Sequence, residues 1–377
     1  MKTHHGSRAI ASATPLAAAV AAMSLTLTAC TAGAAGTETA GSSDATPIHG
    51  DISFNDAALT KLDSAIKAAL KGKKLDGLNL AMVVNVPQGY WLGGNAGFSR
   101  GLSELGVKGV FQTPDNGRLD EQLAIIRTLR SQQVSAFSIS AIDPAALKAP
   151  LQSATAAGIP VLAIDSPLPA ADGAALYLGT PNYQAGQKAG EAMRAALGGK
   201  GRVAVLVGSL TASNALERIQ GFEDALKGTD IKVVQKIADQ MSPTNATNDA
   251  QQILSDHPDI TGLYCVYSYD GPAAASAVWE SGKTGKVKVV SDDADPQTLG
   301  FIHQGVIQAT VVQSPYQQGY TGAFLLAALR VLGRKATMDL VKPYLGSDGT
   351  LSSGVGVVTQ ENLAAFTASQ NKLGISE

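Results

Sequence analysis

The chain has 377 residues, which is long enough for two domains that each bury a hydrophobic core. Hydrophobic residues make up 45% of it and charged residues only 16%, which indicates a globular α/β protein and excludes a disordered or coiled-coil chain. The formal net charge is −2 and no stripe of Lys and Arg occurs, so we expect no nucleic acid as a partner.

The first thirty residues have the pattern of an export signal. Lys2 and Arg8 precede a stretch from residue 11 to residue 27 that is too weakly apolar to be a stable membrane span. The stretch ends in Leu-Thr-Ala followed by Cys30, which resembles the lipobox of bacterial lipoproteins. We therefore predict a lipoprotein signal peptide over residues 1–29, lipidation at Cys30, and an exported protein anchored to the membrane in the periplasm or at the cell surface. A chance cysteine behind an ordinary signal peptide is the alternative.

Two further segments precede the main body of the chain. Residues 30–52 are rich in Ala, Gly, Ser and Thr, a composition typical of a flexible tether. Residues 53–77 carry Leu59, Leu62, Ile66 and Leu70 at helical spacing behind Asn55 as a possible cap, which predicts a structural lead-in helix.

From residue 78 onwards short aliphatic runs alternate with amphipathic segments. Continuous apolar strands separated by helices favour parallel sheets that are covered on both faces. Roughly ten strands exceed one sheet of this kind, so we predict an α/β protein with two doubly wound, Rossmann-like lobes. The predicted strands are 78–84, 108–111, 136–139, 161–164, 175–178, 202–207, 231–237, 262–266, 287–290 and 309–313, and predicted helices include 119–132, 145–157, 183–197, 212–226, 246–256, 271–281 and 316–332.

Eight short motifs follow these strands in a fixed order. They are NVPQGYW at 85–91, AGIPVLAID at 157–165, LGTPNYQAG at 178–186, LERIQGF at 216–222, SYDGPA at 268–273, VVSDD at 289–293, ATVVQSPYQQG at 309–319 and TQENL at 359–363. In order and spacing they resemble the ribose-binding-protein family of type I periplasmic binding proteins, from about residue 78 to the C-terminus.

The resemblance implies the periplasmic-binding-protein-like I fold, in which a three-strand hinge joins the lobes near residues 180–181, 313–314 and 342–343. The N-terminal lobe would take residues 78–180 plus 314–342, and the C-terminal lobe 181–313 plus 343–377. It also implies a monomeric solute-binding protein that closes on a small sugar-like ligand and delivers it to the permease of an ABC importer.

A sugar presents hydroxyl groups at its edge and apolar C–H faces, so its site needs planar polar groups and an aromatic ring. In a doubly wound fold we expect these groups in the loops after the strands. Ser166 stands where many ribose binders have Arg, and Ser140 where they have Asn, so the choice of monosaccharide stays open. The candidate ligand-binding residues are Tyr90, Trp91 and Asp165 from the first lobe, Arg218, Asp270 and Asp293 from the second, and Gln313 at a hinge.

Most candidates also have a structural interpretation. Tyr90 and Trp91 could pack beneath the following helix. Asp165 could end a turn, and Arg218 could be a solvated charge on a helix face. Asp270 could cap the next helix.

Other functional classes lack their motifs. No G-x-S-x-G, no phosphate-binding loop and no EF-hand spacing around Asp293 occurs, and His257 and His303 stand alone, so we expect no enzyme, no cofactor and no metal. Cys265 lies in an apolar strand, so we predict that its thiol is buried in the core and unreactive. A repressor similar to the lactose-repressor family would begin with a helix-turn-helix domain. Here the export-signal pattern and Cys30 stand in that place, which disfavours a repressor. The remaining alternative is an exported sensor for a nucleoside or an autoinducer.

Overall fold

The computed structural model describes residues 47–87 and 89–375. The predicted signal peptide, the lipidation site Cys30 and most of the predicted tether lie outside these residues. Within the described part of the chain, no helix combines the length and the apolar character that a membrane crossing needs.

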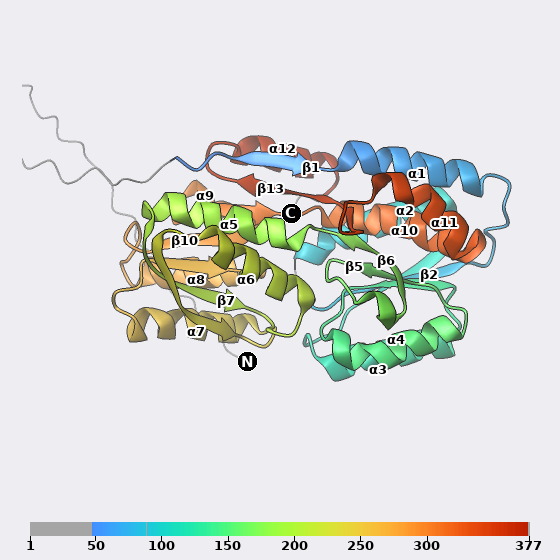
Figure 1. Cartoon of the computed structure of the whole chain (residues 1–377), viewed down its shortest axis with the longest axis horizontal. Coiled ribbons are helices and arrows are strands. Elements are labelled where there is room, and N and C mark those ends of the chain that lie inside the picture. The colour runs from blue at the N-terminus through green and yellow to red at the C-terminus, as the bar shows by residue number, and fades with distance from the viewer. Residues whose placement is uncertain (1–46, 88, 376–377) are drawn as a thin grey trace, which may run out of the picture. The chain divides into compact units, whose positions relative to one another are not determined.

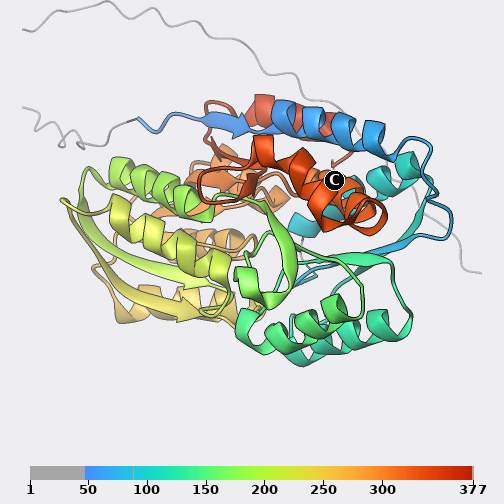
Figure 2. The same cartoon turned by 45° about the vertical axis from the view of Figure 1, so that its right-hand side comes forward.

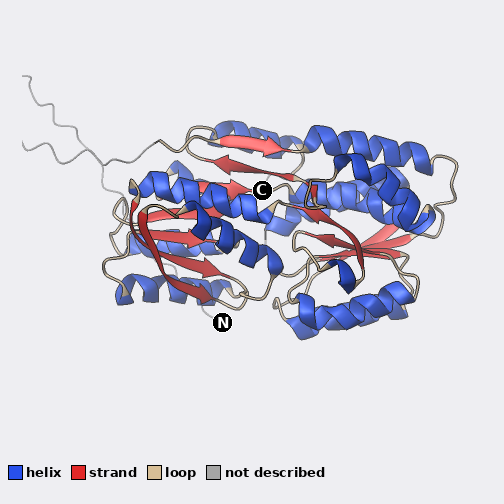
Figure 3. Ribbon diagram, in the orientation of Figure 1, coloured by secondary structure: helices blue, strands red, loops and turns tan. Residues whose placement is uncertain are grey.

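Two mainly parallel sheets form the framework of the body (Figures 1 and 3). The first sheet has the order β12-β6-β5-β4-β2-β3 and the second β1-β13-β11-β10-β9-β7-β8. Every pairing is parallel except those of β13 with β1 and with β11. The strands are β1 (Asp51–Phe54), β2 (Asn79–Val83), β3 (Lys108–Gln112), β4 (Ala136–Ile139), β5 (Val161–Ile164), β6 (Ala174–Gly179), β7 (Lys200–Val207), β8 (Asp230–Ala238), β9 (Gly262–Cys265), β10 (Lys288–Asp292), β11 (Ile307–Val312), β12 (Leu351–Ser352) and β13 (Gly354–Val358).

Helices cover both faces of each sheet, as the views in Figures 1 and 2 show. In the first lobe α1 (Asp56–Leu70), α2 (Tyr90–Leu105), α10 (Pro315–Val331) and α11 (Gly333–Val341) lie on one face and α3 (Leu119–Ser131) and α4 (Pro144–Ala156) on the other. In the second lobe α5 (Asn182–Leu197) and α6 (Ser213–Ala225) lie opposite α7 (Pro243–Asp256), α8 (Asp270–Glu280), α9 (Pro296–His303) and α12 (Leu363–Lys372). The prediction of two doubly wound lobes is therefore confirmed.

The strand sequences explain this arrangement. In β7, Val203 and Val205 point into one hydrophobic cluster while Ala204 and Leu206 point into another, and all four are buried. Successive side chains of a strand face opposite sides, so a strand that is aliphatic at every position needs a cover on both faces.

The chain passes between the two sheets at four places within the described residues. Two of these lie between β6 and α5 and between β11 and α10. The third differs from the position expected near residues 342–343: β12 pairs with β6 in the first sheet, so the chain crosses at Ser353. This places residues 351–352 in the first lobe rather than in the second.

The fourth crossing was not expected from the sequence. Strand β1 begins at Asp51, inside the predicted tether, and joins the edge of the second sheet, whereas α1 packs on α10 of the first lobe. Asn55 lies between them, where its backbone N–H donates to the Ser353 carbonyl and its side chain donates to the Ser352 carbonyl at 2.9 Å. The lead-in segment is thus a fourth connection between the lobes.

Candidate functional site

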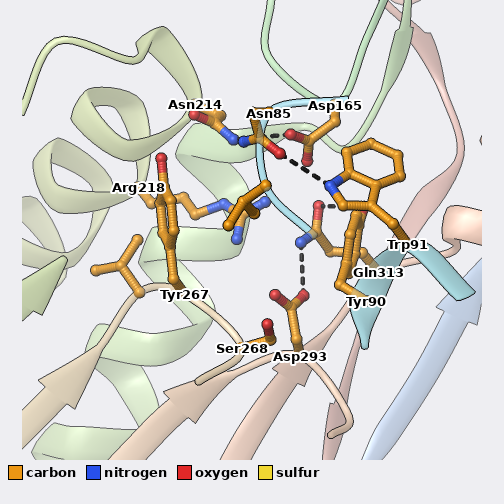
Figure 4. Close-up of a pocket in the computed structure, with 12 residues that line it drawn as sticks. Asn85, Tyr90, Trp91, Asp165, Asn214, Arg218, Tyr267, Ser268, Asp293 and Gln313 are labelled. Atoms are coloured by element: carbon orange, nitrogen blue, oxygen red, sulfur yellow. Dashed lines mark hydrogen bonds between the residues drawn. The ribbon is translucent and has the colours of Figure 1, made fainter. Parts of the chain in front are cut away.

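A small cavity lies where the loops after the strands of the two sheets meet (Figure 4). Its volume is about 30 Å³, which is enough for about two water molecules. Both lobes supply its walls, as expected for doubly wound sheets, whose ligands sit at the carboxyl ends of the strands. The lining residues are Asn85, Val86, Tyr90, Trp91, Asp165, Asn214, Arg218, Val266, Tyr267, Ser268, Asp293 and Gln313.

Six of the seven residues that the sequence singled out line this cavity. Tyr90 and Trp91 begin α2, Asp165 follows β5, Arg218 lies in α6, Asp293 follows β10 and Gln313 follows β11. Asp270 does not belong to the lining.

Close packing of two helices fixes the place of Arg218. A Cβ on Gly186 of α5 would collide with the Arg218 carbonyl, and one on Gly221 of α6 would collide with the Tyr183 carbonyl. The two glycines therefore allow the backbones of α5 and α6 to touch. This contact sets α6 against the second sheet and directs Arg218 toward the end of β10.

The Arg218 guanidinium is buried and only partly paired. Its Nε donates to Asn182 Oδ1 and its Nη1 to Asp292 Oδ2, both at 3.1 Å. The Tyr264 hydroxyl donates to the same Asp292 oxygen at 3.1 Å. Burial raises the pKa of Asp292 to about 7, an effect that the Arg218 charge opposes. Nη2 is buried and makes no hydrogen bond to any described residue, which leaves one charged donor free for a ligand.

Two carboxylates approach the cavity from opposite lobes. Asp165 and Asp293 both have positive φ, at 58° and 69°, a conformation that aspartate tolerates better than most residues. Asp165 Oδ2 accepts hydrogen bonds from Ser140 Oγ at 2.7 Å and, across the two lobes, from Asn214 Nδ2 at 3.1 Å. Asp293 Oδ1 accepts one from Gln313 Nε2 at 2.7 Å.

The pKa of each of these carboxyl groups lies above its usual value. Burial raises the pKa of Asp293 to about 6, and the nearby Arg218 charge limits the rise. Burial also raises the pKa of Asp165, again against the effect of Arg218. With its pKa at about 6, Asp293 is mainly ionised above neutral pH and is protonated in mild acid.

Aromatic rings stand on both sides of the cavity (Figure 4). Trp91 donates from Nε1 to Asn85 Oδ1 at 2.8 Å, and its ring meets that of Tyr90 edge to face at 4.8 Å. The Tyr90 hydroxyl donates to Gln313 Oε1 at 3.4 Å and accepts from Gln318 Nε2 at 3.2 Å. Tyr267 faces this pair from the second lobe, and its buried hydroxyl has no partner within the part of the chain that the structure describes.

Four polar or aromatic lining residues were not among the candidates. Asn214 lies four positions before Arg218, so the two share one face of α6, and that spacing could have identified it. Tyr267 and Ser268 come soon after β9, at the end of the sheet where ligands bind. Asn85 lies between β2 and α2 and accepts the hydrogen bond from Trp91, a contact that the sequence pattern does not reveal.

Asp270, the seventh predicted site residue, holds a neighbouring loop in this structure. Its side chain is fully buried at the start of α8, where Oδ2 accepts from the Tyr267 backbone N–H at 3.0 Å. Burial, together with the neighbouring Asp239 carboxyl, raises its pKa well above the usual value. Asp270 therefore holds the loop that carries Tyr267 and does not face the cavity.

Other reactive groups lie apart from the cavity. Cys265 is a buried free thiol whose pKa is raised well above its usual value by burial, as expected of a core residue. Among residues 47–87 and 89–375 no cluster of three or more His, Cys, Asp or Glu side chains is placed to hold a metal ion. The cavity thus offers carboxylate acceptors, a guanidinium donor and aromatic faces, which suits a small molecule with several hydroxyl groups.

Comparisons with known proteins agree with this description. The family model described as "Periplasmic binding protein domain" matches residues 80–335. The D-allose-binding periplasmic protein of Escherichia coli (strain K12) is 26% identical over 271 residues, which are 70% of this chain and 87% of the relative.

Two solved structures share the fold closely. An ABC transporter solute-binding protein from Burkholderia graminis, in complex with D-arabinose, is 30% identical and has a TM-score of 0.71, with 78% of this chain and 99% of that chain covered. GanP, a glucose-galactose binding protein from Geobacillus stearothermophilus, is 27% identical with a TM-score of 0.69, covering 76% and 99%.

Proposed function

Because this chain belongs to the periplasmic binding protein family, we propose that it captures a monosaccharide between its lobes and delivers it to the permease of an ABC importer. The observation that carries the proposal is the cavity, where Asp165 and Asp293 from opposite lobes flank a buried Arg218 with an unpaired donor. Sugar hydroxyl groups can donate to both carboxylates and accept from the guanidinium at the same time.

The size of the cavity implies that the lobes move. Small-molecule pockets usually measure about 300 Å³ or more, whereas this one holds about 30 Å³. A sugar can enter only if the lobes separate, and closure then brings polar groups of both lobes onto it. A ligand that contacts both lobes binds the closed form best, so it shifts the population toward that form.

Gln313 links the cavity to a crossing between the lobes. Its Nε2 donates to Asp293, while its Oε1 accepts from Thr180 Oγ1 at 2.6 Å and from Tyr90. Thr180 and Gln313 lie on two of the four segments that connect the sheets. A sugar that engages Asp293 therefore acts directly on the groups that set the hinge.

The lipid anchor is part of the proposal. Periplasmic binding proteins are exported, and the lipobox-like segment before Cys30 supports attachment to the membrane through a lipidated cysteine. Metabolic labelling with a fatty acid should mark the full chain and not the Cys30→Ala variant. Label retained by that variant would remove Cys30 as the lipidation site.

Binding without turnover is the expected activity. The protein should be titrated calorimetrically with D-allose, D-ribose, D-arabinose, D-xylose and D-galactose, and its melting temperature measured with each. A sugar present at about 100 times its Kd stabilises the folded form by about 2.7 kcal/mol, which raises the melting temperature by several degrees. The recovered sugar should be chemically unchanged. No binding heat and no melting shift with any of the five would reject the proposed function.

A further inference from the structure

A second hollow adjoins the cavity and is much larger. Its volume is about 580 Å³, and its walls come from the start of α2, the start of α9, Pro315 and helix α12; we call it the α12 groove. Tyr90, Asp293 and Gln313 line both the cavity and the groove. The full lining is Gly89, Tyr90, Leu92, Asp293, Ala294, Asp295, Pro296, Leu299, Gln313, Pro315, Leu363, Phe366, Thr367, Gln370, Asn371, Gly374 and Ile375.

We propose that the α12 groove receives a neutral, apolar substituent of the bound sugar, so that the ligand of this protein is a glycoside with an apolar aglycone. The inference rests on the proposed function, because it assumes that the sugar itself occupies the cavity.

The wall that the two hollows share is the first support. The three shared side chains hydrogen-bond to one another: Gln313 donates to Asp293 and accepts from the Tyr90 hydroxyl. The trio is thus the wall that the two hollows share, and a substituent on this side of the sugar enters the groove where these side chains part to admit it.

A glycine at the junction leaves room between the lobes. Gly89 precedes Tyr90, and a Cβ there would lie 3.3 Å from Asp295 Oδ2 of the facing lobe. That separation is tighter than ordinary van der Waals contact, so any larger side chain at position 89 would narrow the gap between the lobes at this point.

The chemistry of the walls selects the class of substituent. Seven lining side chains are large and apolar or are proline, and Leu92 is 55% exposed on a helix whose neighbouring Trp91 is buried. An apolar group seated here would remove Leu92 from water, which favours binding in proportion to the area covered. The seven are Leu92, Pro296, Leu299, Pro315, Leu363, Phe366 and Ile375.

The negative charge of the groove lining disfavours an acidic substituent on the sugar. The charged members of the groove lining are Asp293 and Asp295, so a phosphate or uronate substituent would meet like charge without a cation to pair with. Thr367, Gln370 and Asn371 on α12 add neutral hydrogen-bonding groups at one wall. A neutral aglycone with a mainly apolar body matches this lining.

Calorimetric titration with matched glycosides tests the inference. The probes are free D-xylose, D-galactose and D-ribose, the methyl α- and β-glycosides of each, and the corresponding p-nitrophenyl glycosides. One p-nitrophenyl glycoside should bind at least about tenfold more tightly than its methyl counterpart, because the aryl ring buries apolar area that a methyl group cannot.

Two exposed leucines provide the variants. Leu92→Trp places a larger ring in the part of the groove beside Tyr90 and should reduce the aryl gain while leaving the affinity for the free sugar unchanged. Leu216→Trp is the matched control: Leu216 is 47% exposed on α6 and lies outside both hollows, so this variant should keep the aryl gain.

The outcomes separate the inference from the proposed function. If free sugars bind but no aryl glycoside binds more tightly than its methyl counterpart, the inference fails and the proposed function stands. An aryl gain that Leu92→Trp leaves at its full size also overturns the inference. If neither sugars nor glycosides bind, both are rejected.

Discussion

Replacing Arg218 tests how the cavity recognises its ligand. The Arg218→Lys variant keeps a positive charge beside Asp292, but one ammonium group cannot serve Asn182, Asp292 and the ligand from three directions. The free Nη2 donor is lost, and a hydrogen bond from a charged donor is worth about 1.5–3 kcal/mol. Sugar affinity should therefore fall roughly tenfold to a hundredfold.

Arg218→Met tests stability instead of recognition. Asp292 is fully buried, and without the guanidinium it keeps only the Tyr264 hydroxyl as a side-chain partner among the described residues. Breaking a buried ion pair by removing one member costs about 3–5 kcal/mol of unfolding free energy.

The loss in the methionine variant should depend on pH. The pKa of Asp292 is raised to about 7 even beside Arg218, and it rises further when the cation is removed. A raised carboxyl pKa means that the folded state favours the protonated form, so stability is lost as the pH rises through that pKa and regained below it. The destabilisation should be large at pH 8 and smaller at pH 5.

Calorimetry at pH 7.5 and urea unfolding at both pH values measure these effects. A lysine variant that binds sugar as tightly as the parent protein would refute the role of the Nη2 donor. A methionine variant as stable as the parent at pH 8 would refute the account of the buried pair.

Three further outcomes follow from the geometry. Trp91→Ala should lower the unfolding free energy by about 3–5 kcal/mol because the ring is buried. Trp91→Phe keeps a buried ring and should lose mainly the hydrogen bond to Asn85, so an equal loss of unfolding free energy in the two variants would contradict this. Sugar affinity should fall as the pH drops from 7 to 5, because Asp293, with its pKa raised to about 6, is protonated in that window and loses acceptor capacity; the Asp293→Asn variant should bind weakly with a flat pH profile. Asn55→Ala should cost about 1 kcal/mol in urea unfolding through the bond to Ser352, and an unchanged midpoint would show that the fourth connection adds no stability.

The sequence predicted the strands from β2 to β11 because most of them are buried on both faces and read as aliphatic runs, while the edge strands β3 and β8 still carry Val or Ile between helical segments. It did not predict β12, which has two residues, or β13 (Gly354–Val358), where two glycines interrupt a short valine run. Strand β1 sits beside a small-residue segment and takes its partner, β13, from the other end of the chain. Such pairings depend on distant segments that local patterns do not contain.

Helix α2 shows that local sequence patterns can also miss a helix. Its four glycines lower the intrinsic helix propensity, yet they let α10 approach closely. A Cβ on Gly97 would collide with the Tyr316 carbonyl, and one on Gly319 with the Gly94 carbonyl. The packing that stabilises this helix is therefore tertiary, and its sequence signal is the spacing of small residues.

Two of the three predicted aspartates face the cavity and one does not, and the difference has a physical reason. Asp165 and Asp293 end their strands with positive φ, which turns them toward the cavity, whereas Asp270 begins a helix and binds back to its own loop. All three look alike in sequence, as acidic residues in a loop that follows a buried strand. Backbone conformation and the neighbouring Asp239, which lies on another loop, distinguish them.

A crystal structure of the protein grown with the tightest-binding sugar of the panel is the most direct measurement. We predict that the sugar lies between the lobes, with oxygen atoms within hydrogen-bonding distance of Arg218 Nη2 and of the Asp165 and Asp293 carboxylates. A sugar bound on the outside of either lobe, with these three side chains in contact only with protein, would contradict the account.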